Sequence, residues 1–174
     1  MTSTQSLRAL IREVPDFPRP GVVFRDITPL LANAAGLRRS IRAMSAPWRD
    51  QGIEVVVSME ARGFIFGTAV AAALAAGFVP VRKAGKLPWN TVSTTYRLEY
   101  GEDALEIHRD ALAPGSRVLL VDDVIATGGT AAAALKLIEQ LGGLVVGAQF
   151  LIELVSLGGR ARLGGRELKS VIAY

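Results

Sequence analysis

The residues best suited to chemistry lie in one stretch, residues 118–130, which reads VLLVDDVIATGGT. Its first four residues, 118–121, are apolar, a pattern typical of a strand buried on both faces of a parallel sheet. Two acids, Asp122 and Asp123, follow, and then comes the small-residue loop 126–130. A helix is predicted next, because apolar residues recur at helical spacing until a glycine pair ends the pattern. This order places a ligand site at the carboxyl end of a sheet strand.

The loop after the acids has the composition of an anion site. Gly128 and Gly129 permit unusual backbone dihedral angles and let a ligand approach the main chain closely. The backbone N–H groups and the positive end of the predicted helix attract a phosphate, and two threonines add hydroxyl donors. The predicted phosphate-binding residues are Ala126, Thr127, Gly128, Gly129 and Thr130.

The two acids need a different partner. Asp122 and Asp123 cannot share that phosphate, because like charges repel. Carboxylates accept hydrogen bonds, so a pair of adjacent hydroxyl groups, such as the 2′ and 3′ hydroxyls of ribose, suits them. Side chains alternate along a strand, so both acids reach one ligand only if the chain bends there. The alternative is that Asp123 caps the loop and the glycines merely begin a helix.

With these features, VLLVDDVIATGGT resembles the phosphoribosyl-diphosphate signature of the type I phosphoribosyltransferases. In that family the acids hold the ribose and the ATGGT loop holds the 5′-phosphate. The stretch is not a Walker A loop, because no lysine follows the glycines, and GxGxxG occurs nowhere in the chain. The resemblance implies a single domain over residues 1–174, with a small hood from residues 1–35 and a flexible lid over residues 83–100.

The elements around this stretch agree with an α/β fold. Apolar runs separated by helical patterns predict a doubly wound parallel sheet flanked by helices. The expected strands lie near residues 53–57, 78–82, 117–121 and 145–152.

Composition limits the class of protein. The chain has 174 residues, no cysteine and a single histidine, His108, which excludes disulfides, thiolate chemistry and histidine-cluster metal sites. The net charge is +4, and the 20 basic residues are scattered, which favours a small phosphate ligand over nucleic acid. No apolar stretch approaches 18 residues and the first residues are polar, so we expect a cytoplasmic protein without a membrane partner.

A proline-rich segment points to the second substrate. PGVVFRDITPLL closely matches the segment with which the adenine-using members of the family hold the purine ring. The resemblance puts Val23 and Arg25 at the base edge through backbone groups and lays Phe24 against the base. It puts Leu154 opposite Phe24, with Glu153 nearby. From composition alone, an ordinary cover for the core is the favoured interpretation of this apolar loop.

A second loop of the same kind follows the strand 53–57. Its motif, EARGF, places Arg62 beside a predicted helix N-terminus. The planar fork of arginine suits diphosphate oxygens, and the resemblance gives Arg62 that role. A structural ion pair with Glu60 is the alternative.

The predicted lid carries further charges. Residues 83–95 lack periodicity, and a structureless stretch of that length is typical of a functional loop. The RKxGKLP motif implies that Arg82, Lys83 and Lys86 neutralise the diphosphate, with Arg82 able to serve a neighbouring subunit. The LEYG motif makes Glu99 the acid–base candidate near purine N7 and puts Tyr100 beside it, closing the site. Without the resemblance, Glu99 is a solvated hairpin carboxylate.

The implied reaction joins adenine to 5-phosphoribosyl 1-diphosphate and gives AMP and diphosphate, with Glu99, Asp122 and Asp123 as the catalytic residues. Mg²⁺ is expected as a cofactor held mainly by the substrate diphosphate and water, without protein metal ligands. The resemblance also implies a homodimer. Two alternatives stay open: transfer to another purine base, or a regulatory protein that only senses phosphoribosyl diphosphate.

Overall fold

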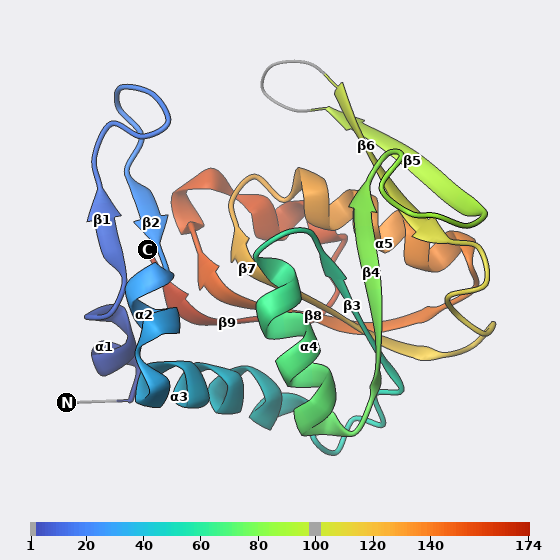
Figure 1. Cartoon of the computed structure of the whole chain (residues 1–174), viewed down its shortest axis with the longest axis horizontal. Helices are drawn as coiled ribbons and strands as arrows, with labels where there is room; N and C mark the ends of the chain where they lie inside the picture. The colour runs from blue at the N-terminus through green and yellow to red at the C-terminus, as the bar shows by residue number, and fades with distance from the viewer. Residues whose placement is uncertain (1–2, 98–101) are drawn as a thin grey trace.

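A seven-stranded sheet forms the centre of the molecule, seen in a computed structural model that describes residues 3–97 and 102–174 (Figure 1). The strands lie in the order β5-β6-β4-β3-β7-β8-β9. Their bounds are β3 Val55–Met59, β4 Gly77–Lys83, β5 Thr91–Arg97, β6 Glu102–His108, β7 Arg117–Ile125, β8 Leu144–Glu153 and β9 Leu168–Ala173. Strands β4, β3, β7, β8 and β9 are parallel to one another, whereas β6 pairs antiparallel with the outer edge of β4 and β5 pairs antiparallel with β6. The predicted α/β fold with a mostly parallel sheet is confirmed.

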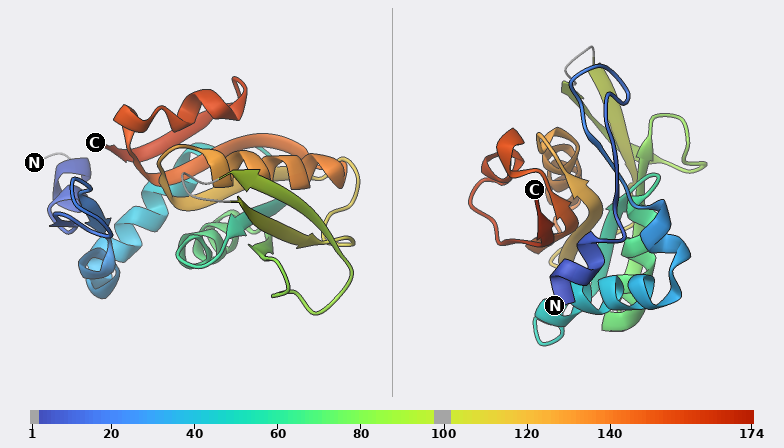
Figure 2. Two further views of the ribbon diagram at one scale, coloured as in Figure 1. Left: turned by 90° about the horizontal axis from the view of Figure 1, so that it is seen from above. Right: turned by 90° about the vertical axis from the view of Figure 1, so that its left-hand side faces the viewer.

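The apolar runs seen in the sequence form the central strands because both faces of the sheet are covered. Helix α3 (Ala34–Ser45) and helix α4 (Gly63–Leu74) lie on one face, and helix α5 (Gly129–Gln140) lies on the other (Figure 2). Alternate residues of β7 therefore enter two separate cores. Val118 and Leu120 pack with α5, and Leu119 and Val121 pack with α4.

Residues 3–32 form a small substructure beside the sheet. Its elements are α1 (Ser3–Arg8), β1 (Arg12–Val14), β2 (Phe24–Asp26) and α2 (Thr28–Ala32), with β1 and β2 paired antiparallel. Leu7, Ile27 and Leu30 are fully buried in the same cluster as Phe66 of α4. The segment predicted as an apolar loop therefore contains a strand and a short helix, anchored to the main core.

Three short 3-10 helices complete the chain: η1 (Ala46–Trp48), η2 (Val155–Leu157) and η3 (Gly159–Leu163). Trp48 is buried, and its Nε1 donates to Gln149 Oε1 at 2.8 Å, as expected for a core tryptophan. Gly147 makes room for that ring, since a Cβ there would lie 2.3 Å from it. In the described part of the chain, no helix has the length and apolar character needed to cross a bilayer.

The stretch predicted to be structureless, 83–95, is shorter than expected. β4 continues to Lys83, and β5 begins at Thr91, so the irregular segment covers residues 84–90. Within that stretch, β5 begins at Thr91, earlier than the hairpin strand 96–100 that the sequence pattern predicts. It forms because threonine and serine fit a pleated strand and because β6 supplies a complete pairing partner.

Candidate active site

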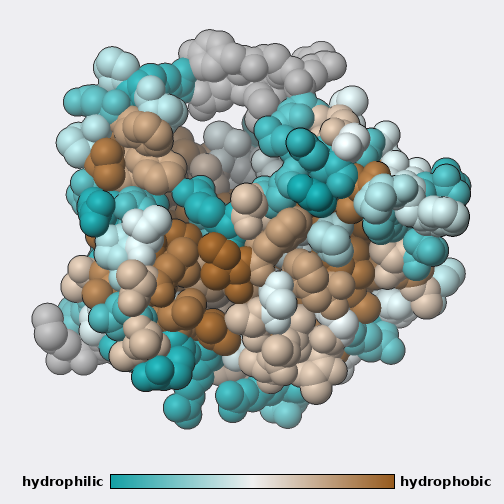
Figure 3. Space-filling view, in the orientation of Figure 1, coloured by the Kyte–Doolittle hydropathy of each residue, from teal (hydrophilic) through white to brown (hydrophobic). Residues whose placement is uncertain are grey.

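A polar pocket of about 380 Å³ opens where β7 ends. It is lined by Glu60, Ala61, Arg62 and the continuous stretch from Asp122 to Ala131. Arg62, both predicted acids and all five predicted loop residues therefore surround one cavity. Figure 3 shows the molecule hollowed between β1 and β2 on the left and β4 on the right, with hydrophilic side chains in the hollow.

The loop joins β7 to α5 through a left-handed residue. Gly128 is the N-cap of α5 with a φ of 78°, a conformation that favours glycine. Helix α5 begins at Gly129 and has 12 residues, so its positive end and its free N–H groups face the pocket. The loop can therefore receive an anion through its backbone.

Both carboxylates reach the pocket although they are adjacent in the strand. Asp123 is 5% exposed, and its Oδ2 lies 2.7 Å from Nε of Arg62. Asp122 lies against the start of α4, where a Cβ on Gly63 would be 2.5 Å from Asp122 Oδ1. The absent side chain at Gly63 therefore leaves the space that Asp122 occupies.

The acid pair is electrostatically unequal. Burial raises the pKa of Asp122 well above its ordinary value of 3.8, and the negative charge of Asp123 raises it further. Asp123 has the Arg62 guanidinium as a partner, whereas that cation lowers the Asp122 pKa only slightly. The pocket thus holds one ion-paired carboxylate and one whose pKa is raised.

This asymmetry predicts a stability effect. The pKa of Asp122 is higher in the folded protein than in the unfolded chain. Its contribution to folding stability is therefore fully present at a pH below the unfolded-state pKa, and it is lost as the pH rises through the folded-state pKa. We expect Asp122→Asn to raise the melting temperature, by more at about pH 7.5 than at about pH 4.5. Thermal unfolding of both proteins at the two pH values measures this. A melting-temperature difference that does not change with pH would contradict the assignment.

Arg82 and Lys83, two of the basic residues assigned to the diphosphate, form ion pairs within the chain. Arg82 Nε lies 2.8 Å from Glu60 Oε2, and Lys83 Nζ lies 3.0 Å from Asp103 Oδ2. The alternative pairing of Arg62 with Glu60 is therefore wrong: Glu60 pairs with Arg82, and Arg62 pairs with Asp123. Lys86 is exposed. Of the four basic residues, Arg62 lines the pocket itself.

A second, more apolar cavity of about 670 Å³ lies beside β2. Val23, Arg25 and Leu154 line it, together with Leu157 and Tyr174. The first three were predicted to surround the base, so most of the expected base site gathers at this cavity.

Phe24 points the other way from Val23 and Arg25, as alternation along a strand requires. Its ring lies edge-on to Phe17, with 5.2 Å between the ring centroids. The Arg62 guanidinium lies over it, 5.1 Å from the ring centroid. Arg62 therefore links the ring expected at the base to the acid expected at the ribose.

Glu153 differs from its expected position near the base. It lines neither cavity, and its carboxylate accepts two hydrogen bonds from Arg160 and one from Ser170. Hydrogen bonds from Arg160 hold the pKa of Glu153 below its ordinary value. Leu154, the next residue, does reach the base-side cavity.

Gly159 and Arg160 were not among the predicted site residues. The Gly158-Gly159 pair was a usable signal, because paired glycines often mark a close backbone approach. The predicted residues Glu99 and Tyr100 lie outside the described part of the chain. In the described residues, no group of three or more metal-binding side chains occurs.

Comparison with known proteins defines the class. The chain matches the phosphoribosyl transferase domain over residues 26–168, and it therefore belongs to the phosphoribosyltransferase family.

Within the family, the chain groups with the adenine phosphoribosyltransferases. It is 55% identical over 168 residues to the adenine phosphoribosyltransferase of Rhodopirellula baltica, covering 97% of this chain and 82% of that relative. It is 56% identical to that of Clostridium perfringens, covering 97% and 98%. Among solved structures, the adenine phosphoribosyltransferase of Thermoanaerobacter pseudethanolicus superimposes with a TM-score of 0.96 at 47% identity, covering 98% and 99%. The Saccharomyces cerevisiae enzyme, solved with adenine and an imino-altritol bisphosphate, gives 0.92 at 40%, covering 97% and 98%.

Proposed function

We propose that this chain is a purine salvage enzyme that transfers the 5-phosphoribosyl group from 5-phosphoribosyl 1-diphosphate to adenine, giving AMP and diphosphate. The observation that carries the proposal is the single pocket in which a helix-capping glycine loop, two carboxylates and an arginine converge. Relatives at 55% and 56% identity carry the name of this activity.

The residues of the pocket divide the sugar phosphate between them. The 5′-phosphate binds the N–H groups of residues 126–130, where the positive end of α5 and two threonine hydroxyls favour an anion. The ribose hydroxyls donate to Asp122 and Asp123. Arg62 leaves its ion pair with Asp123 to bind the diphosphate, which frees Asp123 for the sugar.

Catalysis in this arrangement is electrostatic. Breaking the bond between ribose C1 and the diphosphate oxygen builds positive charge on the sugar, and the two carboxylates lie where that charge develops. The negative charge of the leaving diphosphate is met by Arg62 at the pocket and by the exposed Lys86. Mg²⁺, held mainly by the diphosphate and water, supplies further neutralisation when bound. The carboxylates fit its outer shell, because hard oxygen donors suit this cation.

Adenine is held at the hood. Backbone groups of Val23 and Arg25 meet its edge, and Phe24 lies against one face, adding roughly 0.5–1.5 kcal/mol for a stacked aromatic contact. Glu99 acts as the general acid–base residue that exchanges a proton with purine N7. The solved yeast relative contains adenine, which supports a base site in this fold.

Lys86 provides a selective test of the diphosphate end of the site. Lys86→Ala should weaken binding of inorganic diphosphate by about tenfold, because a charge-assisted contact is lost. Affinity for ribose 5-phosphate should stay the same, since that ligand reaches only the loop. Lys136→Ala, which removes an exposed lysine from α5, is the matched control. Equal losses of affinity for diphosphate and ribose 5-phosphate would show that Lys86 does not bind the diphosphate specifically.

The enzyme acts as a homodimer in which a second copy covers helix α4. This helix, GFIFGTAVAAAL, has no charged residue, yet Ile65 is 41% exposed and Ala72 and Ala73 are exposed as well. A helix that is apolar all round is normally buried, so a second copy of the chain would cover this face.

The proposed location of the enzyme is the cytoplasm.

Ile65→Asp should therefore convert the dimer to a monomer, because it buries an unpaired charge in the interface. Gln140→Asp, at an exposed position on α5, should leave the mass unchanged. Sedimentation velocity at micromolar concentration measures both. Wild-type protein that sediments as a monomer would refute the dimer.

Product analysis tests the reaction itself. Pure protein is given phosphoribosyl diphosphate, Mg²⁺ and each of adenine, hypoxanthine, guanine and xanthine separately. We expect AMP from adenine and no nucleotide from the other bases. A nucleotide formed only from another base would show that the enzyme is specific for that base and not for adenine. Substrate binding without any nucleotide product would leave the sensor alternative.

A further inference from the structure

The glycine-rich segment after β8 packs directly on the phosphate loop. A Cβ on Gly159 would lie 2.3 Å from the Ala126 carbonyl oxygen and 2.9 Å from the Gly128 nitrogen. A Cβ on Gly128 would in turn lie 2.5 Å from the Gly159 carbonyl oxygen. The two backbones are therefore in contact with no side chain between them, so the position of one limits the position of the other.

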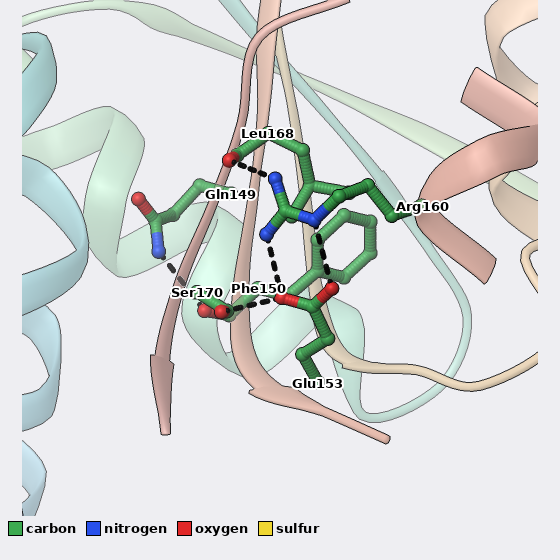
Figure 4. A network of polar contacts seen from close by, with 6 residues as sticks. All are labelled: Gln149, Phe150, Glu153, Arg160, Leu168 and Ser170. Carbon is green, nitrogen blue, oxygen red and sulfur yellow. Dashed lines mark hydrogen bonds and ion pairs between the residues drawn. The ribbon is translucent and has the colours of Figure 1, made fainter. Parts of the chain in front are cut away.

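One arginine ties this segment to the sheet. Arg160 Nε donates to Glu153 Oε1 at 2.9 Å, and its Nη2 donates to Glu153 Oε2 at 2.6 Å (Figure 4). Its Nη1 donates to the Leu168 carbonyl oxygen at 2.8 Å. The planar guanidinium thus joins η3 to the ends of two strands, β8 and β9, with a geometry that lysine cannot reproduce.

The carboxylate that receives this fork is itself fixed. Ser170 Oγ donates to Glu153 Oε2 at 2.7 Å, and Glu153 is 7% exposed. Glu153 pairs across the sheet with Ile125, the last residue of β7 before the loop begins. The ion pair therefore lies beside the point at which the loop leaves the sheet.

We propose that Glu153 and Arg160 are positioning residues for the phosphate loop, acting through Gly159. Their bidentate pair holds the Gly159 backbone against residues 126–128 and thereby sets the direction of the loop N–H groups that meet the 5′-phosphate. The proposal rests on the proposed function, because it assigns the phosphate to that loop. It gives the segment 158–165, which no substrate role explains, a function at the site.

The test compares two ligands that occupy different ends of the site. Binding of ribose 5-phosphate reports on the loop, whereas binding of inorganic diphosphate reports on Arg62 and Lys86. Arg160→Met should weaken ribose 5-phosphate binding at least about tenfold, since misplacement by roughly 1 Å can have effects of that size or larger. Diphosphate affinity should change less than about twofold. Arg160→Lys should recover only part of the loss, because an ammonium cannot form the fork.

Two controls separate positioning from simple stability. Lys169→Met removes a neighbouring ion pair, with Glu167, that does not touch the loop, and it should leave both affinities unchanged. The double variant Glu153→Met/Arg160→Met leaves no unpaired buried charge, which protects folding. It should bind ribose 5-phosphate as poorly as Arg160→Met does. Amide hydrogen exchange should also accelerate at residues 126–130 in the Arg160 variants and not in Lys169→Met.

Folded Arg160→Met protein that keeps wild-type affinity for ribose 5-phosphate and unchanged exchange in the loop would overturn the positioning role. A double variant with restored affinity would overturn it too. Wild-type protein that bound no ribose 5-phosphate would instead refute the proposed function, and the positioning role with it.

Discussion

Gly128→Val should nearly abolish binding of phosphoribosyl diphosphate. Gly128 has a φ of 78°, where a residue with a Cβ loses about 1–2 kcal/mol. Its Cβ would also lie 2.5 Å from the Gly159 carbonyl oxygen, which is backbone and cannot move aside cheaply. The valine side chain would also block close approach of the phosphate. Because of these three effects, we expect the affinity for phosphoribosyl diphosphate to fall at least about 100-fold. Isothermal titration calorimetry measures this.

The same contact means that the variant should lose some stability, because Gly128 is buried. Gly115→Val is the matched control, since Gly115 has a φ of 84° and a Cβ added there would meet nothing within 4 Å. It should show similar backbone strain without a change in affinity. A folded Gly128→Val protein with unchanged affinity would remove the phosphate from this loop.

Asp122→Asn and Asp123→Asn should each lower kcat by about 100-fold, the order of effect found for a single preorganised electrostatic group. An amide still accepts a hydrogen bond from ribose but cannot oppose the charge that develops on the sugar. Steady-state kinetics at saturating Mg²⁺ measures kcat. Asp123→Asn should also strengthen binding of inorganic diphosphate, because Arg62 no longer has to leave an ion pair to meet that ligand.

Asp50→Asn, an exposed acid before β3, is the control and should be neutral. Full activity of both active-site variants would make the acids structural. If Asp122→Asn both raises the melting temperature and lowers kcat, then Asp122 destabilises the folded protein and is required for activity.

The sequence was most informative where one local pattern carries both structure and chemistry. The run 118–121 and the glycines after it predicted a buried strand, a loop and a helix, and all three occur. The pattern worked because burial on both faces demands continuous apolar residues and because a left-handed N-cap favours glycine. The convergence of Arg62 on the same pocket followed from parallel strands ending at one edge.

Pairings between distant side chains could not be read in this way. Nothing local to Arg62 distinguishes Asp123 from Glu60 as its partner, because the choice depends on the spacing of β3, β4 and β7. Glu153 was likewise placed beside the base, whereas its carboxylate meets Arg160. The first part of β5 was not predicted, because its serine and threonine residues obscure the alternation that its pairing with β6 reveals.

The most direct test of phosphate binding at the loop before α5 is a crystal structure of the protein with phosphoribosyl diphosphate and Mg²⁺ bound. We expect the 5′-phosphate within hydrogen-bond distance of the N–H groups of residues 127–130, at N···O separations of about 2.7–3.2 Å. We also expect the ribose hydroxyls on Asp122 and Asp123, with Arg62 turned from Asp123 to the diphosphate. A 5′-phosphate bound anywhere else, with Arg62 still paired to Asp123, would contradict this assignment.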